Sequence, residues 1–133
     1  MSSEDIKKFC HENSPIVLLE VEVIAENDEV RLELLVEDKH TNPYGYLHGG
    51  VQTTIADTAM GAACLLLNKK VVTVSMTIEF LKAVKKGVRV YSDAKVLHNG
   101  RQILICECKL RGEDSEIYSI ANATFFALDE GEK

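Results

Sequence analysis

Most of the chain alternates between apolar and polar positions, with the two-residue period of a half-buried strand. Between residues 20 and 37, two such runs flank the stretch AENDE, which predicts a pair of strands joined by an Asn-Asp turn. The second half of the chain holds four more runs of this kind, separated at hairpin-like intervals by glycine-containing turns. They cover residues 70–84, 87–97, 101–112 and 115–128.

A different period governs residues 50–67. Apolar side chains recur there at helical spacing, at Val51, Ile55, Ala59, Ala62 and Leu66. The run holds few charges, so we expect a helix that is buried nearly all round. A shorter helix is expected near the N-terminus in SSEDIKKFCHENSP, with Ser3 as its cap and Pro15 after its end.

The expected order of elements is a short helix, two strands, one buried helix and four strands. Antiparallel strands combined with one central helix indicate an α+β fold in which the sheet wraps around that helix. One face of the sheet would pack on the helix, and polar side chains would occupy the other face. A chain of 133 residues is the length of one ordinary domain, so we expect residues 1–133 to form a single domain.

Composition and charge exclude several classes of function. Apolar residues make up 46% of the chain, enough for a substantial core, and the formal net charge of −6 disfavours binding to nucleic acid phosphates. The first ten residues lack the apolar region of a signal peptide, and no segment is apolar enough to span a membrane. We therefore expect a cytoplasmic protein that binds neither nucleic acid nor membrane.

The four cysteines show no metal-binding spacing and no disulfide pattern. Cys106 and Cys108 are two residues apart, so on a strand they share a face and cannot easily form a bridge. We expect reduced, mostly buried thiols, and neither a metal nor a cofactor.

The stretch NPYGYLHGGVQTTIAD, residues 42–57, carries the candidate chemistry. Its turn residues lead into a helix whose first turn presents unpaired backbone N–H groups and a positive dipole end. Gly49 and Gly50 would let another group approach that backbone closely, as an oxyanion hole requires. The plainer interpretation is a glycine-rich loop that only begins a helix.

Asp57 is the only charged residue between Gly49 and Asn68. A carboxylate in an apolar helix must be paired, hydrogen-bonded or protonated, so its role is catalytic, or structural through a strand hydroxyl or water. We expect it on a small-residue face with Gly50, Thr53, Thr54, Gly61 and Cys64. Along one helix, Gly49 and Asp57 would stand ~12 Å apart, too far to serve one carbonyl. Two antiparallel copies of the helix remove this difficulty, which points to a site shared across a two-fold dimer.

The pattern Asn42-x5-His48-Gly49-Gly50-x6-Asp57 resembles the hotdog-fold acyl-CoA thioesterases of the PaaI type, close to the 4-hydroxybenzoyl-CoA thioesterases. The resemblance covers nearly the whole chain. It implies a homodimer with shared active sites, assembled into a dimer-of-dimers tetramer. The implied substrate is an acyl-CoA, whose CoA belongs to the substrate and is not a cofactor.

The resemblance also implies roles for single residues. The Gly49 N–H would polarise the thioester carbonyl, and Asp57 of the partner subunit would act as nucleophile or as general base. Asn42 would orient the thioester or the water, and Thr73 would help to hold the hydrolytic water. Ser75, which is expected to face the same way as Thr73, and Gly50 are candidates for binding the substrate. His48 is expected to act as a loop hinge bonded to backbone or directly in the reaction.

The phosphates of CoA require cations. The resemblance places them near the strand ends and the late hairpin, where HNGRQ makes Arg101 the first candidate, followed by Lys82 and Lys85. Each of these residues can equally be a solvated surface cation.

Two alternatives to thioester hydrolysis remain open from the sequence. One is an enoyl-CoA hydratase or dehydratase on the same fold, although the HGG and Asp57 pattern fits such enzymes poorly. The other is a non-catalytic acyl-CoA-binding protein. The sequence leaves the acyl group undetermined.

Overall fold

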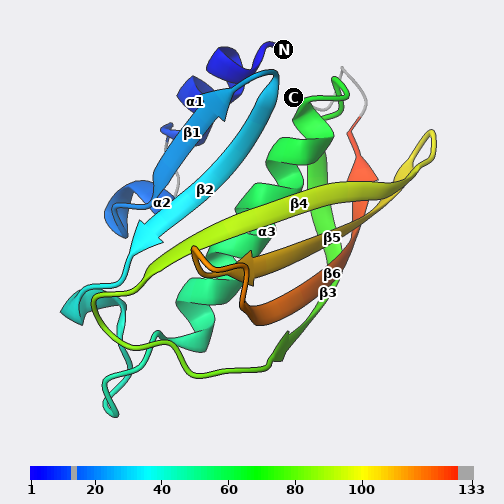
Figure 1. The fold of residues 1–133 in the computed structure, drawn as a ribbon. Coiled ribbons are helices and arrows are strands. Elements are labelled where there is room, and N and C mark those ends of the chain that lie inside the picture. The colour runs from blue at the N-terminus through cyan, green and yellow to red at the C-terminus, as the bar shows by residue number, and fades with distance from the viewer. Residues whose placement is uncertain (13–14, 129–133) are drawn as a thin grey trace.

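A six-stranded antiparallel sheet wraps around one long helix (Figure 1). This computed structural model describes residues 1–12 and 15–128, so residues 13–14 of the expected N-terminal segment and 129–133 of the expected domain lie outside the description. The strand order in the sheet is β1-β2-β4-β5-β6-β3. The strands are β1 (Glu22–Glu26), β2 (Glu29–Leu35), β3 (Val71–Phe80), β4 (Arg89–Asn99), β5 (Ile103–Arg111) and β6 (Ile117–Ala127).

The central helix α3 (Gly49–Leu65) contacts β2, β3, β4, β5 and β6. Every side chain between Val51 and Leu66 is buried or partly buried, which confirms the expectation of a helix covered nearly all round. The helix begins one residue earlier and ends two residues earlier than its apolar period predicted. It ends early because the chain then turns, and Asn68 adopts a left-handed φ of 61° that no helix residue has.

The N-terminal helix α1 (Ser3–Cys10) is capped by Ser2 and not by Ser3. The Ser2 hydroxyl accepts a 3.1 Å hydrogen bond from the Asp5 N–H, and the Asp5 carboxylate accepts one from the Ser2 N–H. This reciprocal pair is a capping box, and it requires an acid three residues after the cap, which Ser2 has at Asp5. Pro15 opens a second short helix, α2 (Pro15–Leu18), a position that suits its fixed φ.

The predicted turn between the first two strands is confirmed. Asn27 and Asp28 both have positive φ, at 50° and 61°, between antiparallel β1 and β2. Two successive left-handed residues are the mark of a type I′ hairpin turn, whose twist matches that of the strands it joins.

The inner face of the sheet forms the core with α3. Leu104, Cys106, Cys108 and Leu110 on β5 are all fully buried, as their alternation predicted. The four cysteines are buried, free thiols. Cys64 was expected beside Asp57 on an open face of α3, but its sulfur lies 3.5 Å from that of Cys106 and faces the sheet.

A bulge in β3 reverses one expectation about side-chain direction. Thr73 is paired with Phe125 of β6, whereas Ser75 is paired with Thr124, so β3 has one extra residue at Val74. Cross-strand partners share a face, and Phe125 is buried on the helix side. Thr73 therefore faces α3, and Ser75 faces away from it, contrary to the expectation that the two point the same way.

Strand β3 lies at the edge of the sheet and pairs only with β6. Its exposed side chains include four large apolar ones: Val72, Val74, Phe80 and the following Leu81 are 47%, 61%, 51% and 58% exposed. Within residues 1–12 and 15–128, no helix has the length and apolar character needed to cross a bilayer.

Candidate active site

The loop NPYGYLHGG is organised by Asn42. Its side-chain oxygen accepts hydrogen bonds from the N–H groups of Tyr44 and Tyr46, at 3.0 and 3.1 Å, and this closes the turn around Gly45. Gly45 has a φ of +87°, which a residue with a Cβ rarely adopts. The bonds occupy Asn42 Oδ1 and leave its Nδ2 group as the donor that a substrate or water can use.

His48 caps the N-terminus of α3. Its Nδ1 atom accepts a 2.8 Å hydrogen bond from the Gly50 N–H, so Nδ1 carries no proton in this arrangement. This is the backbone-bonded hinge that was one of the two expectations for His48.

In the first turn of α3, one backbone N–H group has no hydrogen bond to the capping residue His48. The N–H groups of Val51 and Gln52 donate to the His48 carbonyl, and that of Gly50 donates to the His48 ring. In the described part of the chain, the Gly49 N–H has no hydrogen-bond partner. A free N–H at the positive end of a 17-residue helix is the type of donor that an oxyanion requires.

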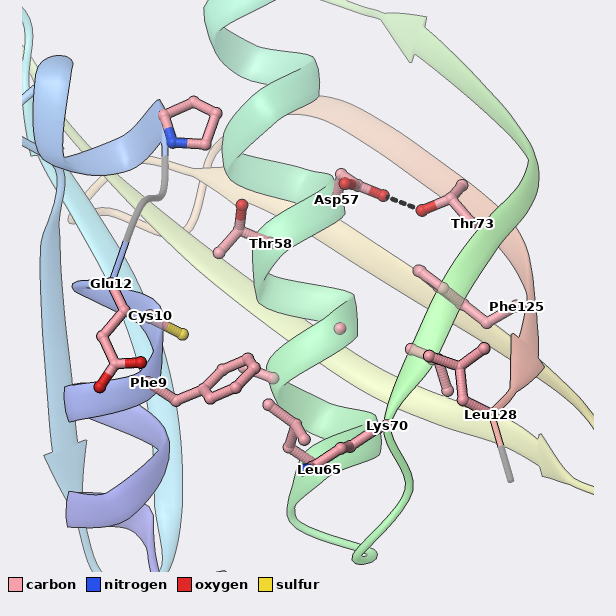
Figure 2. A pocket seen from close by; sticks show the side chains of 14 residues that line it. Phe9, Cys10, Glu12, Asp57, Thr58, Leu65, Lys70, Thr73, Phe125 and Leu128 are labelled. Atoms are coloured by element: carbon pink, nitrogen blue, oxygen red, sulfur yellow. Dashed lines mark hydrogen bonds between the residues drawn. The ribbon is translucent and has the colours of Figure 1, made fainter. Parts of the chain in front are cut away.

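Asp57 is held by the edge strand. The Thr73 hydroxyl donates a 2.7 Å hydrogen bond to Asp57 Oδ1, as Figure 2 shows. Thr73 is thus in direct contact with the carboxylate, and its implied part in holding the hydrolytic water stays a prediction. The bond orients Asp57 and leaves its second oxygen available to a substrate or a water molecule.

The candidate residues fall into two separate cavities. Asp57 and Thr73 line a cavity of about 570 Å³ between α1, α3 and β3 (Figure 2). Asn42, Gly49 and Lys82 line another, of about 350 Å³, at the N-terminus of α3. The chain thus brings together the members of each group but does not place Gly49 and Asp57 in one cavity, as their spacing along the helix predicted.

Gln52 is a candidate that the sequence did not reveal. It lines the cavity of Gly49, is only 4% exposed, and its Oε1 atom has no hydrogen-bond partner among the described residues. A buried amide oxygen without a partner is costly, so such groups deserve a functional explanation. The only signal in the sequence was a polar residue at a buried position of an apolar helix.

The candidate cations lie at opposite ends of β3. Lys82 forms a 2.5 Å ion pair with Glu116, and this hydrogen bond raises the pKa of Lys82 above its usual value, so it stays charged. Lys85 is exposed in the same region, where its backbone bridges to Tyr46. Arg101 is exposed on the β4–β5 hairpin, next to Gln102. The Gln102 carbonyl accepts a hydrogen bond from the Ala127 N–H, and Ala127 is the partner of Val71 in the sheet. Arg101 therefore lies near the Val71 end of β3.

The described residues contain no group of three or more histidines, cysteines and carboxylates placed to bind a metal ion. The groups that the site offers are a free N–H donor, a carboxylate held by a hydroxyl, and amides from Asn42 and Gln52.

Comparisons with known proteins identify the family of this chain. The model of the thioesterase superfamily matches residues 44–118, more than half of the chain. Human acyl-coenzyme A thioesterase 13 is 34% identical over 83 residues, which cover 61% of this chain and 59% of that protein.

Two solved structures share the fold over nearly the whole chain. A thioesterase from Haemophilus influenzae superimposes with a TM-score of 0.84 at 26% identity, covering 97% of this chain and 92% of that one. The PaaI protein from the phenylacetic acid degradation operon of E. coli has a TM-score of 0.86 at 22% identity, covering 96% and 94%. The sheet wrapped around one helix is thus the hotdog fold, and the chain belongs to the thioesterase superfamily as a thioester hydrolase.

Proposed function

We propose that this protein hydrolyses acyl-CoA thioesters at two sites shared between the subunits of a homodimer. In each site the Gly49 N–H of one subunit polarises the thioester carbonyl, and Asp57 of the second subunit drives the attack. The observation that carries this proposal is the division of the candidate residues between two cavities of one chain, both of them bordered by the exposed edge strand β3.

The apolar edge of β3 supports the dimer. A ten-residue edge strand with exposed valines presents a row of unpaired backbone groups and invites a second strand. Pairing with a second copy of β3 covers this edge and extends the sheet across a two-fold axis.

Antiparallel pairing of β3 also brings the two halves of each site together. Gly49 lies against Phe80, because a Cβ added to Gly49 would stand 3.1 Å from the Phe80 ring. Asp57 is bonded to Thr73, toward the other end of the strand. In an antiparallel pair, the Phe80 end of one strand lies beside the Val71 end of the other. Gly49 of one subunit then approaches Asp57 of the second.

The reaction follows from these groups. An oxygen nucleophile attacks the carbonyl carbon, and the negative charge that develops on the carbonyl oxygen is stabilised by the Gly49 N–H and the helix dipole. The carbon–sulfur bond then breaks, and CoA leaves. As general base, Asp57 takes a proton from the attacking water and passes it to the sulfur. As nucleophile, Asp57 forms an anhydride, CoA leaves as a thiolate that takes a proton from solvent, and water hydrolyses the anhydride to the free acid and the carboxylate. Incorporation of ¹⁸O from labelled water into Asp57 during turnover would establish the second route, with water attacking the Asp57 carbonyl.

The same pairing gathers the candidate cations. Arg101 lies near the Val71 end of β3, and Lys82 and Lys85 lie beyond the Phe80 end. In the dimer, Arg101 of one subunit approaches Lys82 and Lys85 of the second, at the mouth of each shared site. There they bind the phosphates of CoA.

Gln52 and Asn42 complete the Gly49 half-site. Pantetheine, the arm that carries the thioester, contains two amides, and these match a buried glutamine amide without a partner. The comparison with named acyl-CoA thioesterases favours hydrolysis over the hydratase and over the non-catalytic protein.

Mixing two inactive variants tests the shared site. In a heterodimer of Asp57→Ala and Gly49→Val chains, one site has an intact Gly49 and an intact Asp57, and the other has neither. Random exchange of subunits should therefore restore about a quarter of the wild-type activity, measured as CoA release. If each site were built from one chain, the mixture would stay inactive, and that result would refute the shared site.

A further inference from the structure

The cavity beside Asp57 has a polar end and an apolar body. Asp57 and Thr73 lie at one end, and Phe9, Leu65 and Lys70 lie at the other (Figure 2). Apolar or small residues from α3, β3, β6 and the segment after β6 form the walls between them. The walls include Gly61, Ala62, Val71, Phe125 and Leu128.

Gly61 keeps this cavity open. A Cβ added to Gly61 would meet no atom within 4 Å, although Gly61 stands in the middle of α3. Glycine destabilises the interior of a helix relative to alanine, and no neighbour in the described chain occupies the space that its missing side chain leaves. Packing within the chain therefore does not explain this glycine, whereas a ligand in the cavity does.

We propose that the cavity holds the acyl chain of the substrate and that Gly61 admits a straight apolar chain of about ten carbons. This inference rests on the proposed function, because it places the thioester carbonyl at Asp57. It assigns the acyl class that the reaction alone leaves open: a medium-length aliphatic chain in preference to a short or an aryl one.

The dimensions of the cavity set the chain length. From Asp57 to Leu65, the helix advances eight residues, or ~12 Å. An extended chain of single bonds advances roughly 1.2 Å per bond, since three backbone bonds span about 3.6 Å. About ten bonds thus fill the path from the carboxylate to Leu65. Lys70 lies beside Leu65 at the far end of the cavity (Figure 2), so a longer tail meets a charged side chain and gains no further apolar burial there.

A chain-length series tests the class of substrate. We would measure CoA release from butanoyl-, hexanoyl-, octanoyl-, decanoyl-, hexadecanoyl- and phenylacetyl-CoA. Each methylene buried should raise kcat/KM by up to about fourfold until the chain has about ten carbons. A flat series, or a preference for phenylacetyl-CoA, would overturn the inference. A protein that hydrolyses none of these substrates contradicts the proposed function, and the acyl site with it.

Two substitutions on α3 test where the acyl chain binds. Gly61→Leu should project into the cavity, lower kcat/KM for decanoyl-CoA at least tenfold, and leave that for butanoyl-CoA nearly unchanged. Ala63→Leu is the matched control, because Ala63 is two residues further along the helix and does not line the cavity. Ala63→Leu should keep the wild-type dependence of kcat/KM on acyl-chain length.

Gly61→Ala is a second variant that tests the same position if Gly61→Leu does not fold. Alanine is favoured in a helix interior, so this variant should fold and shift the series toward shorter chains. Equal loss on butanoyl- and decanoyl-CoA in either Gly61 variant would contradict a chain-length role. Dissociation of the dimer by Gly61→Leu, seen by size-exclusion chromatography with light scattering, would show that a second subunit fills the space and would also overturn the inference.

Discussion

The Thr73 hydroxyl donates a 2.7 Å hydrogen bond to Asp57 Oδ1, and this bond ties the middle of α3 to the edge strand β3. One carboxylate oxygen is thereby held in place, while the other remains available. The strand that holds the carboxylate is also the strand whose outer edge is exposed. In the proposed dimer, the orientation of Asp57 and the pairing of the subunits would therefore both depend on β3.

Asp57→Asn should abolish most of the hydrolysis. The amide is nearly isosteric and can still accept the Thr73 bond, but it can neither take a proton from water nor attack as a carboxylate. We expect kcat to fall by about 10²–10⁴-fold, the usual contribution of an acid–base group. Thermal unfolding should be unchanged, and unchanged CoA release across an acyl-CoA panel would remove Asp57 from its role.

Thr73→Val should weaken catalysis by loss of orientation. Valine keeps the shape of threonine but removes the donor to Asp57, and a hydrogen bond to a charged group contributes about 1.5–3 kcal/mol. We expect kcat to fall about tenfold or more, with little change in KM. Thr73→Ser keeps the hydroxyl and should stay within a fewfold of wild type. An equal loss of kcat in Thr73→Val and Thr73→Ser would show that the hydroxyl group does not contribute to catalysis.

Val74→Lys should separate the subunits. Val74 is 61% exposed at the bulge of β3, and a lysine on an edge strand opposes pairing with another strand. The mass measured by light scattering should fall to that of a monomer, and activity should be lost with it. Leu97→Lys serves as control, since Leu97 is 52% exposed but lies on β4, inside the sheet order. An active, monomeric Val74→Lys protein would refute the shared site.

Arg101→Ala should weaken the binding of CoA but not the chemistry. Removing an exposed cation costs up to ~1 kcal/mol, so we expect KM to rise severalfold for an acyl-CoA, with a loss that shrinks at high salt. The corresponding acyl-pantetheine, which lacks the nucleotide, should show no change. Lys95→Ala is the control, because Lys95 is an exposed cation within β4, away from both strand ends. Equal effects on the two substrates would contradict phosphate binding by Arg101.

Gln52→Leu should stabilise the folded protein and lower its activity toward acyl-CoA at the same time. A buried amide oxygen without a partner costs about 1–3 kcal/mol, and leucine removes that cost while filling a similar volume. We expect a higher melting temperature together with a lower kcat/KM for acyl-CoA. A less stable protein with full activity would show that Gln52 serves the fold and not the substrate.

Much of this protein is determined by its sequence. Alternation along β5 is enough to identify the inward set of Leu104, Cys106, Cys108 and Leu110, because a strand turns successive side chains to opposite faces. The isolated carboxylate of Asp57 and the glycines before the helix identify the candidate site. Their spacing is enough to predict that one chain does not join them, because the rise of a helix per residue is constant.

Only the tertiary structure decides the rest. The bulge at Val74 turns Ser75 away from α3, and periodicity cannot reveal an extra residue, because it depends on pairing with β6. The bond between Thr73 and Asp57, the missing partner of Gln52 Oε1 and the empty space at Gly61 arise where segments far apart in the sequence meet. Local pattern determines which way a side chain points along its own element, and packing between elements determines what it meets there.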